Sequence, residues 1–168
     1  MIIRDKKYED IEEFILLVND VWNDTYRGIV DDSFLDNMKN TVDDRVKRSK
    51  ENFDKKPKDT YLAEDNGRLI GYTSAEKSRD KDYPNSGEIS SLYLRKEYHG
   101  KGLGKELFNY SLNKLKKQGF KDYIISCLDG NPTNEFYKHM GGKYYKSEMK
   151  KIGDKEYKEN YYYFEMRW

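Results

Sequence analysis

The sequence predicts one α/β domain over residues 1–168, built as a mixed, mostly antiparallel sheet flanked by helices. A chain of 168 residues is long enough to bury a single core. Charged residues make up 38% and hydrophobic residues only 36%, but the 15% aromatic content is too high for a disordered, solvating chain. Strand and helix patterns follow in the order β-α-α-β-β-β-α-β-α-β-β, which indicates a sheet covered by helices.

The N-terminal elements are a short strand, two helical segments and a hairpin. Residues 2–4 form the strand, and apolar residues at helical spacing predict a helix over residues 9–23. A more polar helical segment over residues 32–52 is expected to break near Thr41 and to end before Pro57. Two strand-like runs, 61–63 and 69–72, flank Asp65-Asn66-Gly67, and Asn-Gly in this position is a strong hairpin signal.

The C-terminal elements begin with a strand over residues 88–94, after a charged loop. A helix is expected from Leu103 to Gly119, since glycine commonly follows the last helical residue. A strand over residues 123–128 comes next, and Asn131-Pro132 pairs a good N-cap with the proline favoured at the first helical position. This short helix ends at Gly141-Gly142, and a hairpin over residues 143–151 and 157–168, turning at Gly153-Asp154, completes the domain.

Composition excludes several classes of protein. No segment approaches the roughly 20 apolar residues of a membrane helix, and no basic stretch followed by an apolar one opens the chain. We therefore expect a cytoplasmic protein without a signal peptide or membrane anchor. Cys127 is the single cysteine and cannot form an internal disulfide, and no Cys/His group has zinc-ligand spacing, so no metal is expected.

Charge is unevenly distributed, although the net charge is only +1. Residues 1–94 hold 16 Lys and Arg against 21 Asp and Glu, whereas residues 95–168 hold 16 against 10. The split suggests an anionic ligand near the second half and a cationic one near the first, and the alternative is an uneven but inert surface. A nucleic-acid partner has only this basic half and scattered aromatic residues in its favour, so none is expected.

The most informative segment is the glycine-rich loop between the strand over 88–94 and the next helix. Gly100, Gly102 and Gly104 alternate with other residues there. Glycines let the backbone approach a ligand closely, and the exposed N–H groups and dipole of the helix attract phosphate. The spacing G-x-G-x-G fits neither the dinucleotide fingerprint G-x-G-x-x-G nor the P-loop.

Three segments resemble the GNAT superfamily of acyl-CoA-dependent N-acetyltransferases. His99-x-x-Gly102-x-Gly104 is similar to its pyrophosphate loop, Gln/Arg-x-x-Gly-x-Gly/Ala, with histidine at the first position. The run from Asn131 to Gly142 looks like its Asn-x-x-Ala-x-x-Phe-Tyr-x-x-x-Gly-Phe segment in compressed form. Residues 21–28 resemble the helix-to-loop corner of many bacterial members. Together with the strand order, the likeness covers nearly the whole chain.

The resemblance implies that the fourth and fifth strands splay apart and that acyl-CoA enters the gap. The residues it places on the cofactor are Leu92, Tyr93, Leu94, His99, Gly100, Lys101, Gly102, Leu103, Gly104, Asn131, Asn134 and Tyr137. Purely structural roles are the alternatives for some of these residues. Leu92 and Leu94 also suit a hydrophobic core, and Asn131 also suits a helix cap.

The resemblance also suggests catalytic and acceptor-site residues. Tyr137 would lie near the cofactor sulfur and protonate the departing thiolate, and the backbone N–H of Tyr93 would polarise the thioester carbonyl. Glu88 is the candidate base that takes a proton from the amine, the alternative being a strand-end carboxylate that meets solvent or a lysine. Trp22 and Tyr26 would line the acceptor site, with Tyr72 as a further candidate, although Trp22 also completes the apolar stripe of its helix.

The implied function is direct transfer of an acetyl group from acetyl-CoA to a primary amine, with a small amine such as a polyamine favoured. A protein lysine or N-terminal acetyltransferase and an acyl-CoA-binding regulatory domain without turnover remain alternatives. No covalent acyl-enzyme is expected, since Cys127 lacks a partner base and reads as a buried structural thiol. The run from Tyr161 to Phe164 fits alternating strand faces or a homodimer contact.

Overall fold

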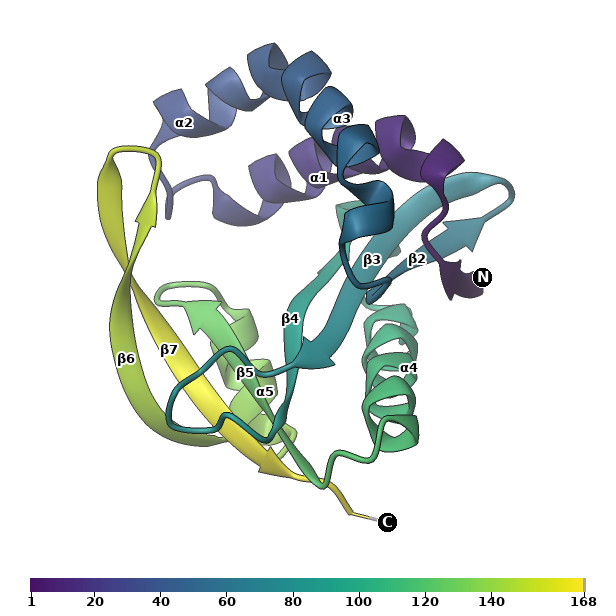
Figure 1. Ribbon diagram of the computed structural model, residues 1–168. Coiled ribbons are helices and arrows are strands. Elements are labelled where there is room, and N and C mark those ends of the chain that lie inside the picture. The colour runs from purple at the N-terminus through teal and green to yellow at the C-terminus, as the bar shows by residue number, and fades with distance from the viewer. Residues whose placement is uncertain (168) are drawn as a thin grey trace. The chain divides into compact units, whose positions relative to one another are not determined.

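The computed structural model describes residues 1–167, so Trp168, which we had placed in the closing strand, lies outside the described residues. One seven-stranded sheet has the strand order β1-β2-β3-β4-β5-β7-β6 (Figure 1). The strands are β1 (Ile2–Asp5), β2 (Thr60–Asp65), β3 (Arg68–Lys77), β4 (Gly87–Leu94), β5 (Asp122–Leu128), β6 (Lys143–Ile152) and β7 (Lys155–Glu165). The helices are α1 (Ile11–Tyr26), α2 (Asp32–Asn37), α3 (Val42–Glu51), α4 (Leu103–Lys117) and α5 (Thr133–His139).

This order of elements confirms the predicted α/β class. The helical segment expected to break near Thr41 does so, because the 3₁₀ turn Met38–Thr41 separates α2 from α3. The chain divides into two compact units. The first holds Met1–Ser74 and Ser91–Tyr110, and the second holds Ala75–Ser90 and the chain from Ser111 onward, so that β3, β4 and α4 contribute to both.

In the first unit, antiparallel β1, β2 and β3 carry apolar side chains on both faces. Leu62 packs with Leu17 and Val21 of α1, whereas the next residue, Ala63, packs with Leu107 of α4. Consecutive residues of a strand point to opposite faces, so α1 and the start of α4 cover opposite sides of these strands. The β2–β3 turn confirms the Asn-Gly prediction, with positive φ at Asn66 (49°) and Gly67 (77°).

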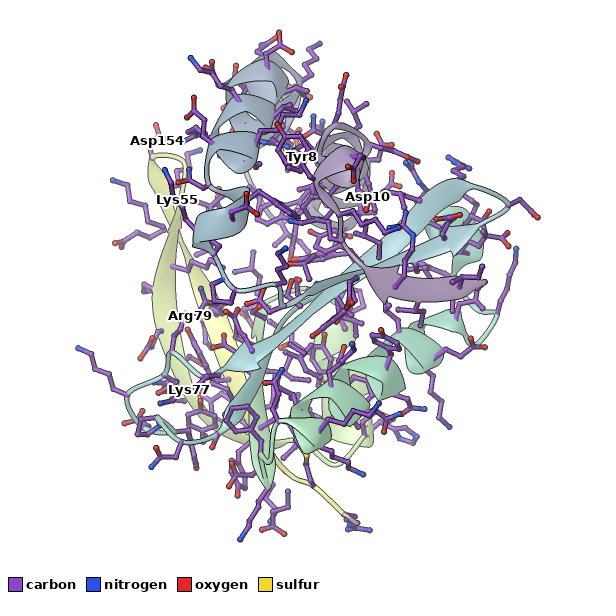
Figure 2. The ribbon with its side chains drawn as sticks, turned by 45° about the vertical axis from the view of Figure 1, so that its right-hand side comes forward. Tyr8, Asp10, Lys55, Lys77, Arg79 and Asp154 are labelled. Carbon is purple, nitrogen blue, oxygen red and sulfur yellow. The ribbon has the colours of Figure 1, made fainter. Side chains whose placement is uncertain are left out.

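The start of α1 is tied to β1 by an ion pair. Asp10, labelled in Figure 2, accepts hydrogen bonds from the Arg4 guanidinium at 2.7 and 2.9 Å and from the Lys7 amide at 2.7 Å. The carboxylate thereby satisfies a backbone N–H that the first helical turn leaves unpaired.

In the second unit, β7 pairs antiparallel with β5 and with β6. The β6–β7 hairpin turns at Gly153 (φ 65°), and Figure 1 shows it as a long, twisted ribbon. The glycine at position 142 has a steric reason, because a Cβ there would lie 2.6 Å from Cζ of Phe164 and 2.8 Å from the Tyr137 carbonyl oxygen. An aromatic residue, as in the family pattern, could not occupy this backbone position unchanged.

Among the strand pairings that the structure describes, only that of β4 with β5 is parallel, and the others are antiparallel. β4 and β5 run parallel, with Gly87, Glu88 and Ile89 opposite Tyr123, Ile124 and Ile125. The register covers only the first residues of β4 (Gly87–Leu94), as expected for strands that splay, and it confirms the predicted mostly antiparallel sheet. Within residues 1–167, no helix has both the length and the apolar character needed to cross a membrane.

Candidate active site

The glycine-rich loop of the first unit leads from β4 to the start of α4. Gly100 and Gly102 have positive φ, 74° and 79°, a backbone conformation that side chains with a Cβ rarely adopt. A Cβ added at Gly100, Gly102 or Gly104 would meet no heavy atom within 4 Å, so the space next to the loop is open. An anion such as a pyrophosphate could therefore approach the backbone of this loop closely, next to the N-terminus of α4.

The remaining predicted cofactor residues of the first unit flank these glycines along the chain. Lys101 is exposed and its ammonium lies 5.2 Å from the Tyr98 ring centroid, and Leu103 opens α4. His99 is exposed and its Nε2–H donates to the Leu94 carbonyl at 2.8 Å, so this ring orders the loop. Leu92 and Leu94 are partly buried and pack against the cluster of Ala63, Ile70 and Leu107, so a packing role is compatible with the predicted backbone contact to a cofactor.

Four aromatic residues from distant parts of the sequence form a cluster in the first unit. This aromatic cluster consists of Trp22, Tyr26, Tyr72 and Tyr93. The rings of Trp22 and Tyr26 lie 4.7 Å apart, those of Tyr72 and Tyr93 stack at 5.2 Å, and the hydroxyls of Tyr26 and Tyr93 are 2.6 Å apart. Burial raises the pKa of Tyr72, so its phenol stays protonated. The predicted acceptor-site residues are thus brought together.

A cavity of about 660 Å³ lies within the second unit. Its wall includes the predicted base Glu88 at the start of β4 and side chains from β5, β6, β7 and the loop after β3. The charged residues of the lining are Arg79, Asp80, Lys81, Asp82, Glu88, Lys146, Glu148, Lys150 and Glu159. Its carboxylates come from both halves of the sequence, so the predicted assignment of cationic and anionic ligands to separate halves does not describe this cavity.

The charges buried in this wall are mostly negative. The side chain of Asp80 is 3% exposed, and those of Glu88 and Glu159 are 10% exposed. The basic groups nearest to Glu88 and Glu159 are far more exposed, 69% for Arg79 and 49% for Lys150, and lie at 3.4 and 3.6 Å. An exposed cation at such a distance is a weak partner, so an ammonium ion could take its place.

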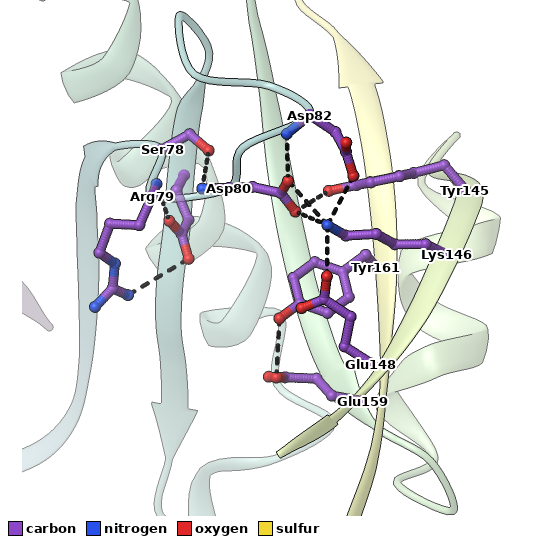
Figure 3. Close-up of polar contacts among 10 residues, drawn as sticks. Ser78, Arg79, Asp80, Asp82, Tyr145, Lys146, Glu148, Glu159 and Tyr161 are labelled. Carbon is purple, nitrogen blue, oxygen red and sulfur yellow. Dashed lines mark hydrogen bonds and ion pairs between the residues drawn. The ribbon is translucent and has the colours of Figure 1, made fainter.

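Glu88 is oriented by the loop that follows β3. Its Oε2 accepts a hydrogen bond from the backbone N–H of Arg79 at 3.1 Å, and its Oε1 lies 3.4 Å from Nη2 of the same residue (Figure 3). Arg79 stands just beyond the end of β3 (Figure 2). The carboxylate is therefore buried, oriented by one residue and open to a cavity, which is an arrangement suited to a general base.

The asparagine side chains of α5 and of the loop before it differ in how many hydrogen bonds they make within the protein. Asn131 lies two residues before the start of α5, and its Oδ1 accepts from the Thr133 amide at 3.0 Å, while its Nδ2 makes no hydrogen bond to the described residues. Asn134 is fully committed: its amide group donates to the carbonyls of Leu128 and Asn131, both at 2.8 Å, and accepts from Tyr162 and Asn160. Of the two asparagines, Asn131 therefore has the side-chain donor that is better able to bond a cofactor.

Tyr137 and Cys127 are both buried in the second unit. The ring of Tyr137 lies 5.7 Å from that of Phe136 and 6.3 Å from that of Tyr162, and it does not line the cavity around Glu88. Burial, reinforced by the charge of Glu159, raises the pKa of the Cys127 thiol to about 12.

Several residues of the cavity escaped the sequence analysis. Asp80 and Asp82 read only as part of a charged loop, and Lys146 and Glu148 as ordinary polar positions of a strand. One signal could have found part of the site, because Glu148 and Glu159 occupy directly opposed positions of the hairpin. Like charges placed opposite each other are unfavourable on a plain surface. Within residues 1–167, no group of three or more His, Cys, Asp or Glu is arranged to hold a metal ion.

Comparisons with known proteins identify a family and similar folds. The model of the acetyltransferase (GNAT) family matches residues 18–141. The sequence is 28% identical over 138 residues to the uncharacterized N-acetyltransferase YuaI of Bacillus subtilis, covering 80% of this chain and 76% of that protein. The structure is similar to that of PaiA N-acetyltransferase from Thermoplasma acidophilum in complex with coenzyme A, with a TM-score of 0.64, 22% identity, and coverage of 94% and 96%. YncA of Salmonella typhimurium with acetyl-CoA also matches, with a TM-score of 0.64, 18% identity, and coverage of 98% and 92%.

Proposed function

We propose that this chain, which belongs to the acetyltransferase (GNAT) family, transfers the acetyl group of acetyl-CoA directly to a small primary amine, with a polyamine favoured. The observation that carries the amine acceptor is the cavity of about 660 Å³ with Glu88 in its wall. A buried carboxylate there can both attract an ammonium group and remove its proton.

The glycine-rich loop is suited to bind the pyrophosphate of acetyl-CoA, the acetyl donor. Open space beside three glycines, two of them with positive φ, leaves room for the pyrophosphate against backbone N–H groups. Lys101 would add positive charge, and the backbone of Leu92, Tyr93 and Leu94 would hold the pantetheine arm. The Nδ2 of Asn131, which makes no hydrogen bond within residues 1–167, is a further donor for that arm.

The proposed reaction is a direct displacement. Glu88 takes a proton from the amine through a water molecule, and the free amine then attacks the thioester carbonyl carbon. The Tyr93 N–H stabilises the negative oxygen, the C–S bond breaks as the carbonyl re-forms, and Tyr137 protonates the departing thiolate. The second proton, which the nitrogen loses as the amide forms, passes through water and restores the Tyr137 hydroxyl. The high pKa of Cys127 supports direct transfer, because a protonated thiol is a poor nucleophile.

The wall of the cavity supports a cationic acceptor. Glu88 and Glu159 are buried there, while their partners Arg79 and Lys150 are exposed enough to be displaced; Asp80 is already paired with Lys146. A polyamine carries an additional positive charge besides the reacting nitrogen, so it would gain from the second carboxylate. We therefore favour a small polyamine over a protein N-terminus or lysine, which remain the alternative acceptors.

An acceptor screen tests the proposal. The full chain is mixed with acetyl-CoA and with a diamine, a peptide with a free N-terminus, or a blocked peptide with one lysine. Free thiol and acceptor mass are then measured. We expect thiol release with an acetylated diamine. Acetylated peptides would move the function to protein acetylation. A rise in melting temperature with coenzyme A but no acetylated acceptor would indicate a regulatory domain.

A further inference from the structure

The β6 strand contains an irregularity beside the cavity. Its register with β7 shifts between Tyr144 and Lys146, so Tyr145 is an extra residue in the strand. Neighbouring residues of a regular strand point to opposite faces, but a bulge re-aims them. Here Tyr145 and Lys146 both reach Asp80 in the loop after β3, with the Tyr145 hydroxyl donating at 2.9 Å and the Lys146 ammonium lying at 2.8 Å (Figure 3).

Lys146 is surrounded by carboxylates. Its ammonium also lies 2.8 Å from Asp82 and 2.9 Å from Glu148, and the ring centroid of Tyr161 is 5.0 Å away. The Lys146 side chain is 20% exposed and that of Asp80 only 3%, so their pairing is shielded from solvent. A shielded, multiply bonded ion pair holds its partners in place much better than an exposed one.

Asp80 is joined by one residue to the contact that orients Glu88. The Asp80 amide donates to Ser78 Oγ at 3.1 Å, and the Asp82 amide donates to the Asp80 carboxylate at 2.8 Å. Between Ser78 and Asp80 stands Arg79, whose own amide donates to Glu88 Oε2 at 3.1 Å. Any force that fixes the Asp80 side chain therefore also fixes the direction of the Arg79 N–H.

We propose that Lys146 is a positioning residue, which clamps Asp80 and so keeps the Arg79 amide on the Glu88 carboxylate. The inference rests on the proposed function, in which Glu88 is the base. Lys146 takes no part in proton or acetyl transfer. It lies in the cavity wall with its ammonium held by Asp80, Asp82 and Glu148, and it acts by holding the loop from Ser78 to Ser86 against β6. Without the clamp, Glu88 loses its fixed orientation in the cavity, although it remains in the protein.

The first test follows the Arg79 amide by hydrogen exchange, which needs no substrate. In Lys146→Met we expect its exchange to become at least about tenfold faster, because the loop no longer holds the amide on Glu88. Lys143→Met is the matched control, since this lysine lies on the same strand, is 75% exposed and only approaches Glu165 at 3.9 Å. It should leave the Arg79 amide unchanged.

The second test measures acetyl transfer to the diamine. Lys146→Met should lower kcat by about 10- to 100-fold with little change in the KM for acetyl-CoA, as expected when a base is misplaced by about 1 Å. Asp80→Asn should cause a similar loss, and the double variant should lose little more than either single one. Tyr145→Phe, which removes one hydrogen bond to Asp80 and keeps the ring, provides a milder variant if the others fold poorly.

The two proposals fail in different ways. A wild-type chain that acetylates no amine would overturn the proposed function, whereas the exchange of the Arg79 amide would still report on the clamp. Unchanged Arg79 exchange in Lys146→Met, or additive kcat losses in the double variant, would overturn the positioning role while leaving acetyl transfer intact. Lys146→Arg keeps the positive charge. A kcat for this variant that is much closer to wild type than that of Lys146→Met would support the positioning role.

Discussion

At the scale of the single residue, Glu88 carries most of the proposed chemistry. It is a buried residue that lines a cavity, and both carboxylate oxygens contact Arg79. The sequence showed only a glutamate at the start of a strand, for which a base and a solvent-exposed carboxylate were equally good interpretations. Burial and the cavity depend on β5, β6 and β7, which come much later in the chain, and these contacts favour the base.

Glu88→Gln keeps the shape of the side chain and removes the basic oxygen. We expect kcat for acetyl transfer to fall by roughly 10²- to 10⁴-fold, the usual contribution of general base catalysis. The rise in melting temperature with coenzyme A should be retained, because the proposed function gives Glu88 no role in cofactor binding. Glu135→Gln, at a glutamate that is 78% exposed on α5, is the matched control. Equal rates and equal pH profiles for Glu88→Gln and wild type would make Glu88 a structural residue.

Cys127 provides a second prediction for a single residue. With its pKa raised to about 12, its thiolate fraction at pH 8 is roughly 10³-fold below that of an ordinary cysteine thiol. A thiol-reactive disulfide should therefore label the native chain at least about 10³-fold more slowly than the urea-unfolded chain. Rapid labelling of the folded protein, or an acetyl group found on Cys127 after mixing with acetyl-CoA, would contradict direct transfer.

At the scale of the element, the glycine-rich loop is the part most open to prediction. Its features are local, since alternating glycines between a strand and a helix set both the positive φ angles and the exposed N–H groups. The Asn66-Gly67 turn was predictable for the same reason. The bulge in β6 was not, because a register shift depends on the pairing with β7, and period-two patterning cannot show it.

Gly102→Leu tests the role of the loop in cofactor binding. The leucine side chain would fill the open space in which we place the pyrophosphate, so the rise in melting temperature with coenzyme A should disappear. Gly119→Leu is the matched control, because Gly119 also has positive φ (90°) and open space but follows the end of α4. Both variants bear similar backbone strain, and only the first should lose the shift. A retained shift in Gly102→Leu would remove the loop from the cofactor site.

The loop from Ser78 to Ser86 leads to a prediction about pH. Burial acts to raise the pKa of Asp80, but the hydrogen bonds from Lys146, from the Asp82 amide and from Tyr145 outweigh it, so the pKa lies below its usual value. A carboxyl group with a depressed pKa stabilises the fold at neutral pH, and this contribution is lost as the pH falls through the folded-state pKa.

Lys146→Met removes the main cation and should raise the pKa of Asp80, since Asp82 and Glu148 are the remaining nearby charges. The free energy of unfolding should then be lower than in wild type at pH 7, but it should fall less between pH 7 and pH 3, because Asp80 now binds its proton at a similar pH in the folded and unfolded chains. Urea unfolding between pH 3 and pH 7 measures this, with Lys143→Met as control. Parallel pH profiles for Lys146→Met and wild type would mean that Lys146 does not set the charge state of Asp80.

At the scale of the whole molecule, the positive and negative charges nearly cancel. What a ligand would meet therefore depends on where the fold places the charged side chains. The uneven split along the sequence predicted a cationic ligand near the first half, but Asp80 and Glu88 share the cavity with Glu148 and Glu159 of the second half. Strand pairing mixes the two halves, so a count along the chain could suggest a cationic ligand but could not place the carboxylates proposed to bind it. The family, by contrast, was readable from short motifs and strand order.

The measurement that tests the central claim most directly compares a diamine with a monoamine of the same chain length as acceptors. Initial rates of coenzyme A release by the full chain are measured at low and high salt. If buried carboxylates select the acceptor, kcat/KM should be at least about tenfold higher for the diamine, a difference of about 1.4 kcal/mol, and the advantage should shrink with salt. Equal kcat/KM values at both salt concentrations would contradict a cationic acceptor in this cavity.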